Sequence, residues 1–321
     1  MTDATLTPVQ TAQKMFDAAL ARNKQRADII FFKAFIAGVF LSFGGLLHVI
    51  VSGGSAGLTS ANPGLVKLLG GLVFPIGLVM IVLQGQELLT SNMMTVPMLL
   101  VKRAAPWWSL PMNWLLVLFG NLTGSLFFAG VLLPAFFLRS HTQPMCAVSC
   151  CKLASLIVSL VSLMLIISTQ SSHKAMDPHW HQIFLRGIGC NWLVCIAVWQ
   201  AMAATDVISK IVAIFIPIFT FVAAGFDHVP AYLTCIYRFF IPLGIMMGAN
   251  MTVADYVKKS LIASFLGNVV GALLVALPFM YFFNPQFERE SRDLEEQGSS
   301  SGSSLVDRVL SRRTDFSMRK E

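Results

Sequence analysis

Apolar stretches of about 20 residues recur along this chain, and no other feature restricts its fold as much. This is the length at which an α-helix crosses the hydrocarbon core of a bilayer. Only 12% of the 321 residues are charged and 55% are hydrophobic, whereas soluble domains carry about 25% charged residues. The alternating pattern of a membrane β-barrel is absent from the sequence. We therefore expect an all-α integral membrane protein.

The apolar stretches predict six membrane spans. Basic residues flank them, as the positive-inside rule expects, so the net charge of +7 does not indicate nucleic-acid binding. We expect a cytoplasmic amphipathic helix over 1–28, a transport domain over 29–283 and a disordered cytoplasmic tail over 284–321. The spans are 29–51, a second from about Leu65 to Val101, 112–138, 183–202, a fifth starting near Ile208, and 261–283.

One short pattern occurs twice. Residues 119–126 read Phe-Gly-Asn-Leu-Thr-Gly-Ser-Leu, and residues 266–273 read Leu-Gly-Asn-Val-Val-Gly-Ala-Leu. The two copies lie in the third and the last span. A duplicated membrane half is typical of inverted-repeat channels and transporters, whose permeation path lies between the halves. The sequence thus predicts a six-span inverted repeat that moves a solute.

The second and fifth spans are broken at matching places, over 84–87 and 225–228. A broken helix exposes backbone groups at membrane depth, which is tolerated only where they are buried in protein or line a cavity. Matched breaks in the two halves therefore indicate the position of a pore. We expect the acidic residues Glu87 and Asp227 to support the two loops.

Several polar side chains near these breaks are candidates for function. An ionisable residue inside a membrane is by default a candidate for function, and histidine changes its charge near neutral pH. His228 is therefore the leading candidate. A packed, hydrogen-bonded histidine is the alternative. Thr90 could donate to a passing anion or to His228, or could cap the second half-helix. Lys67, facing outward, and Lys210, facing inward, could attract anions or act as interface anchors.

Apolar side chains could form gates that narrow the permeation path, although ordinary packing explains these side chains as well. The candidate gates are Phe74, Leu78, Leu89, Val194 and Phe221. No nucleotide-binding loop, zinc-protease motif or nucleophile elbow is present, and the six cysteines lack zinc-ligand spacing. We therefore expect no cofactor, no metal and no enzymatic activity.

Two segments do not fit the repeat. Residues 145–168, inside an atypical insert over 140–172, are apolar enough to span, but a seventh crossing would invert the later spans. They are interpreted as a surface helix or hairpin, or as a translated intron or gene-model artefact. Residues 230–238 carry Arg238, which would cost about 2.5–3.5 kcal/mol near the membrane centre. A non-functional translation of a transporter gene is thus a further reading of the chain.

Three motifs, in order, resemble those of the formate/nitrite transporter family. They are Gly-Gln-Glu-Leu-Leu-Thr-Ser-Asn over 85–92, Cys-Asn-Trp-Leu-Val-Cys-Ile-Ala-Val-Trp over 190–199 and Ala-Gly-Phe-Asp-His-Val over 224–229. The resemblance covers about residues 8–283, except 140–172 and 230–238. It implies an aquaporin-like fold with broken second and fifth helices, assembled as a homopentamer with one pore per subunit.

The resemblance also assigns roles to individual residues. It places the pore and its proton relay at His228, Thr90 and Asn191. Lys210 matches the lysine that helps to draw anions in. The cytoplasmic constriction matches Leu78, Phe74 and Leu89, and the outer one matches Phe221, Val194 and Asn191.

These observations predict proton-coupled transport of a small monovalent anion, nitrite or formate, which crosses as the neutral acid. The sequence following Asp177 is similar to fungal members, which implies a plasma-membrane location with both termini in the cytoplasm. Two alternatives stay open. One is a neutral-solute channel of aquaporin type, although Asn62-Pro63-Gly64 occurs only once. The other is a non-transporting membrane scaffold, whose broken helices would hold no open path.

Overall fold

The computed structural model describes residues 5–132, 178–226, 254 and 257–283. Within these ranges the chain is helical, apart from an isolated bridge between Thr5 and Ala204. Six helical segments there are long and apolar enough to cross a membrane, which confirms the predicted all-α architecture. These segments are Ala27–Gly54, Pro63–Leu83, Ser109–Leu132, Trp180–Ala203, Val207–Ala224 and Val257–Phe282.

Within each continuous stretch of described residues, short connections join one helix to the next. Capping groups mark several of their starts: the Thr7 hydroxyl accepts from the Gln10 amide before α1, and the Asn62 side chain accepts from the Leu65 amide before α4. The elements are α1 (Pro8–Asn23), α2 (Ala27–Gly54), α3 (Ala56–Ala61), α4 (Pro63–Val73), α5 (Ile76–Leu83), α6 (Leu89–Val101), α7 (Ser109–Phe127), the π-helix η1 (Phe128–Leu132), α10 (Trp180–Ala203), α11 (Val207–Ala224), the π-helix η2 (Val257–Leu261) and α15 (Ile262–Phe282).

The second span is broken where the sequence predicts it. Helix α5 ends at Leu83 and α6 begins at Leu89, and a further interruption at Pro75 separates α4 from α5. The fifth span, α11, ends at Ala224, and its C-cap Gly225 adopts the left-handed conformation, with a φ of 75°, that favours glycine at a helix end. The rest of the predicted fifth-span break, the 145–168 segment, 230–238 and the tail from residue 284 lie outside the described residues.

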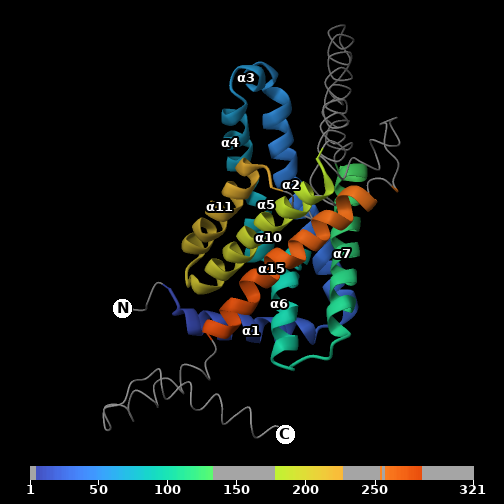
Figure 1. Cartoon of the computed structure of the whole chain (residues 1–321), viewed down its shortest axis with the longest axis vertical. Coiled ribbons are helices and arrows are strands. Elements are labelled where there is room, and N and C mark those ends of the chain that lie inside the picture. Colours follow the sequence, from blue (N-terminus) through green and yellow to red (C-terminus); the bar gives the residue numbers. More distant parts are fainter. Residues whose placement is uncertain (1–4, 133–177, 227–253, 255–256, 284–321) are drawn as a thin grey trace, which may run out of the picture.

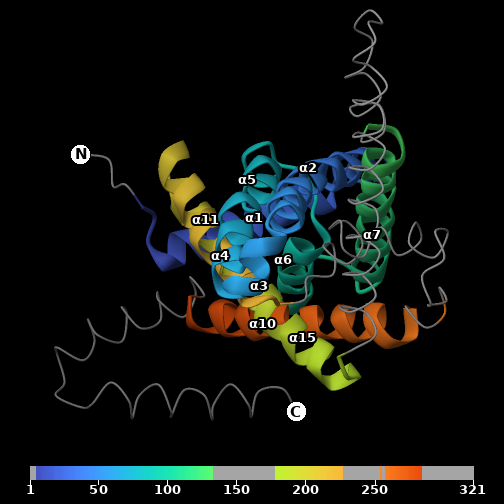
Figure 2. The ribbon, with the colours of Figure 1, turned by 90° about the horizontal axis from the view of Figure 1, so that it is seen from above.

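The helices form one bundle, with α1 across one end (Figure 1). Helix α1 contacts α6 and α10, whereas α3 and the start of α4 lie at the opposite end. Figure 2, viewed from above, shows α3 and α4 stacked over the bundle centre, with α7 and α15 at its periphery. These two ends define the sides from which any path through the bundle would open.

The duplicated glycine pattern serves the same purpose in both halves. The most extensive helix contacts in the described part join α2 to α7 and α10 to α15. A Cβ atom at Gly124 would overlap the carbonyl oxygen of Phe35 in α2, and one at Gly267 would overlap that of Phe184 in α10. Small residues let membrane helices approach this closely. The repeat seen in the sequence is thus a repeat of helix packing.

Candidate functional site

The break in the second span is a short, well-defined turn. Gly85 has a φ of 65°, in the left-handed region that other residues seldom adopt. The amide of Gln86 donates to the carbonyl oxygen of Ile81 at 2.9 Å and so closes the end of α5. Residues Glu87 and Leu88 then run into the first turn of α6, and both are buried. Backbone groups in this segment consequently need partners from within the protein.

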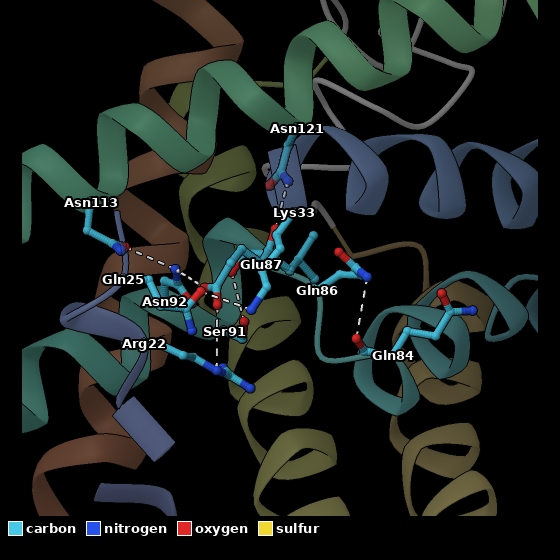
Figure 3. Close-up of polar contacts among 11 residues, drawn as sticks. Arg22, Gln25, Lys33, Gln84, Gln86, Glu87, Ser91, Asn92, Asn113 and Asn121 are labelled. Atoms are coloured by element: carbon cyan, nitrogen blue, oxygen red, sulfur yellow. Dashed lines mark hydrogen bonds and ion pairs between the residues drawn. The ribbon is translucent and has the colours of Figure 1, made fainter. Parts of the chain in front are cut away.

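Asn121, the asparagine of the first glycine pattern, supplies those partners. Its amide nitrogen donates to the carbonyl oxygens of Glu87, at 2.9 Å, and Ala34, at 2.8 Å. Its side-chain oxygen accepts from the amide of Leu89 at 3.0 Å. Figure 3 shows Asn121 reaching from α7 toward the break. A side chain from another helix therefore caps α6, the role that the sequence left open for Thr90.

The Glu87 carboxylate joins three more elements at the same point. It is almost fully buried, with 1% of its surface exposed. One oxygen accepts from the Asn92 amide at 2.9 Å, and the other lies 3.6 Å from Nε of Arg22 in α1. The Asn92 amide also donates to Asn113 of α7 at 2.9 Å (Figure 3). Polar contacts thus hold the break to α1, α6 and α7.

Asn191 brings the first turn of α6 against the second half of the chain. Its side chain is fully buried in α10. The amide nitrogen donates to the carbonyl oxygen of Asn268 at 2.8 Å and approaches that of Thr90 at 3.4 Å. Thr90 and Asn191, both predicted for the pore, therefore lie side by side. The third member of that predicted set, His228, and the predicted loop residue Asp227 lie outside the described residues.

Four of the five candidate gates gather in one apolar cluster, and the fifth does not. Phe74, Leu78, Val194 and Phe221 are buried together. The rings of Phe74 and Phe221 meet edge to face, with centroids 6.0 Å apart. Leu89 belongs to a separate cluster. Phe74 follows α4, which packs against α11, and its ring therefore lies toward Phe221.

The two predicted lysines lie at opposite ends of the bundle. Lys210 is in the first turn of α11, near the bridge between Thr5 and Ala204 and hence near α1. The N-cap of this helix is Asp206, whose pKa is lowered by its hydrogen bonds with Ser209. Lys67 lies at the other end, beside α3.

Lys67 lines a pocket of about 380 Å³ that four spans enclose. Arg186 of α10 and His48 of α2 line it as well, together with Val222 and Gly225 near the end of α11. Among the described lining residues none is acidic, so the pocket is cationic. The sequence reasoning overlooked His48 and Arg186, although both are ionisable residues inside predicted spans and the rule that selected His228 would have found them.

Comparison with known proteins supports what the motifs indicate. A family model described as formate/nitrite transporter matches residues 9–282. The chain belongs to the formate/nitrite transporter family. This family member is 37% identical over 280 residues to a probable formate transporter of Methanothermobacter thermautotrophicus, covering 86% of this chain and 96% of the relative. It is 30% identical to a formate channel of Bacillus thuringiensis, over 82% of this chain and 90% of that one.

A solved structure agrees with the fold. A pentameric formate channel with formate bound matches with a TM-score of 0.61 and 28% identity, over 79% of this chain and 96% of that one. These relatives are transporters and channels, and the chain is a multi-pass membrane protein of the same family.

Proposed function

We propose that this family member carries small monovalent anions, formate or nitrite, across a membrane together with a proton. Family membership and the formate channels among its relatives support anion transport. The proposal rests on one observation, which is that a positively charged pocket lies next to an apolar part of the bundle. A cationic pocket with Lys67 and Arg186 adjoins the buried aromatic pair of Phe74 and Phe221. Such a site gathers anions and then opposes their passage as ions.

Proton coupling follows from the cost of moving a charge past apolar side chains. An unpaired ion in a medium of low polarity costs many kcal/mol, so the anion would have to be neutralised before it passes. The low polarity also favours the protonated acid, because burial disfavours the charged form of a carboxyl group. In this proposal the proton comes from His228 or from water, and the neutral acid passes Thr90 and Asn191.

The apolar side chains are proposed to form two constrictions. Phe74, Leu78 and Leu89 would form the cytoplasmic constriction, and Phe221, Val194 and Asn191 would form the outer one. The contact between the rings of Phe74 and Phe221 would bring the two constrictions close together. Leu89, in the first turn of α6, would narrow the side that faces α1. Lys210 would attract anions at that second entrance. We further propose a homopentamer in the plasma membrane with both termini cytoplasmic, which the pentameric formate channel supports by analogy.

Uptake of isotopically labelled formate and nitrite into proteoliposomes tests the proposal. We expect uptake at about pH 5 to exceed uptake at about pH 7 and to alkalinise the outer solution, since a proton enters with each anion. Replacing His228 by phenylalanine should abolish the pH dependence while assembly persists. Full acid-stimulated uptake by this variant would exclude a proton role for His228.

Two comparisons separate the remaining readings. A variant lacking 145–168 tests the insert, because uptake by this variant alone would identify the segment as an artefact. Osmotic swelling with glycerol tests the neutral-solute channel. Swelling without anion uptake would replace the proposal by that alternative, and neither activity in correctly inserted protein would favour the scaffold.

A further inference from the structure

We infer that His48 makes the cationic pocket a proton-linked binding site for small carboxylate anions, so that the pocket binds them more tightly as the pH falls. This inference deepens the proposed function and rests on it for the identity of the anion. It concerns the pocket at the end opposite α1, not the central histidine. Histidine is the side chain that gains a positive charge in the physiological pH range.

The position of His48 fits this role. The residue lies in the last part of α2 and is half-buried at the pocket wall. Its ring lies against Gly70 of α4, where a Cβ atom would come 2.5 Å from Nδ1, so only glycine leaves room for the imidazole. The same ring meets Phe74 edge to face, with centroids 6.4 Å apart. Phe74 in turn contacts Phe221. His48 therefore lies between the open part of the pocket and the aromatic pair.

The charges around His48 determine the sign of the effect. Lys67 enters the pocket from α4 and Arg186 from α10, and α11 contributes Val222, Ala224 and Gly225. On its own helix, Ser52 lines the pocket. No carboxylate lines the pocket within the described residues. Protonation of His48 would thus add a third positive charge to a site with two, and an anion that binds there would stabilise the protonated form.

The pocket suits a carboxylate in size and polarity. Its volume of about 380 Å³ is within the range of ligand pockets and leaves room for a small anion with part of its hydration shell. Ser52 adds a hydroxyl group beside the cations, whereas the Thr59 hydroxyl, also in the lining, donates to the carbonyl oxygen of Ser55 at 2.9 Å. Binding in this pocket would place the anion beside His48, whose protonated imidazole carries the additional positive charge. His48 would therefore raise the local concentration of the anion under acid conditions.

The test measures binding without transport. Line broadening of [13C]formate by the purified full-length protein in lipid nanodiscs reports the affinity at about pH 7.5 and about pH 5.5, on either side of the usual titration range of histidine. Formate is almost fully ionised at both values, so the ligand itself hardly changes. One further partly solvated unit charge is expected to strengthen binding roughly three- to tenfold at the lower pH.

Two neutral variants of His48 and one control variant isolate the effect of this histidine. His48→Gln should reduce the ratio of the two affinities to about one, as expected when no charge is gained, and His48→Asn serves if that variant fails to fold. His181→Gln, which removes an exposed histidine at the start of α10 outside the pocket, should keep the wild-type ratio.

The outcomes test the His48 binding site and the proposed transport function separately. The inference is overturned if both His48 variants keep the wild-type ratio of affinities at the two pH values. It is also overturned if the wild-type protein binds formate equally well at both pH values. Uptake by proteoliposomes made from the same purified protein reports the proposed function separately. A pH-dependent ratio that requires His48, without uptake, would support the site and refute transport.

Discussion

Replacing Asn121 by alanine tests whether α7 holds the break of the second span together. The native side chain makes three buried hydrogen bonds of 2.8–3.0 Å, to Ala34, Glu87 and Leu89. Ala34 lies inside α2, so its carbonyl oxygen keeps its helical partner. The Glu87 carbonyl and the Leu89 amide lie outside regular helix hydrogen bonding and would lose their bonds to Asn121.

The expected loss of stability follows from these two backbone groups, the Glu87 carbonyl and the Leu89 amide. A buried backbone group that loses its hydrogen-bond partner costs about 1–3 kcal/mol. Two such groups give about 2–6 kcal/mol, and we take ~3 kcal/mol as the central value, because water can reach part of a loosened turn. For a chain of this size such a loss corresponds to a fall in the thermal midpoint of roughly 5–10 °C.

Two measurements check this prediction. Thermal unfolding of the purified protein in detergent gives the midpoint, and hydrogen exchange at the Leu89 amide reports on the turn itself. Thr123→Ala is the matched control, because the Thr123 hydroxyl bonds only to carbonyl oxygens of its own helix, those of Phe119 and Gly120. An Asn121→Ala midpoint equal to that of the control, with Leu89 still protected from exchange, would refute the account of the break given above.

Three further predictions concern packing, charge and pH. Gly124→Ala should weaken the contact between α2 and α7 and lower the thermal midpoint, whereas Gly130→Ala should have little effect, since no atom of the described residues lies within 4 Å of its Cβ position. Arg22→Gln leaves the buried Glu87 carboxylate without its cation and should cost about 1–3 kcal/mol in thermal unfolding; a midpoint like that of the wild type would show that the pair contributes nothing. Asp206 has a lowered pKa in the folded protein, so its stabilisation is present at neutral pH and is lost as the pH falls through that pKa. Asp206→Ala should thus lower the thermal midpoint at about pH 7, with the difference from wild type shrinking toward about pH 3; a difference that does not depend on pH would contradict this.

The sequence predicted the elements because their signals are local. Six apolar stretches gave the spans, since a bilayer demands helices of that length. The interruption after Leu83 was predicted from Gly85 and the polar residues around it, because such a run cannot continue an apolar helix. The duplicated glycine pattern predicted two matching halves, and the structure shows close helix contacts in both, at Gly124 and at Gly267.

The partners of the polar side chains could not be predicted in this way. Asn121 was visible as part of a repeat, but its bonds join residues 34, 87 and 89, which lie on three other segments. The pairing of Glu87 with Arg22 likewise depends on α1 lying across the bundle end. Sequence distance carries no information about such contacts.

The sequence by itself determined that this chain is a bundle of membrane helices with a broken second span and the motifs of its family, because those properties depend on residues that are neighbours in the chain. Only the tertiary structure decided that Phe74 meets Phe221 and that His48, Lys67 and Arg186 line one pocket. The three pocket residues come from three different helices. Their convergence is set by how closely those helices pack, which is a property of the whole bundle and of no single segment.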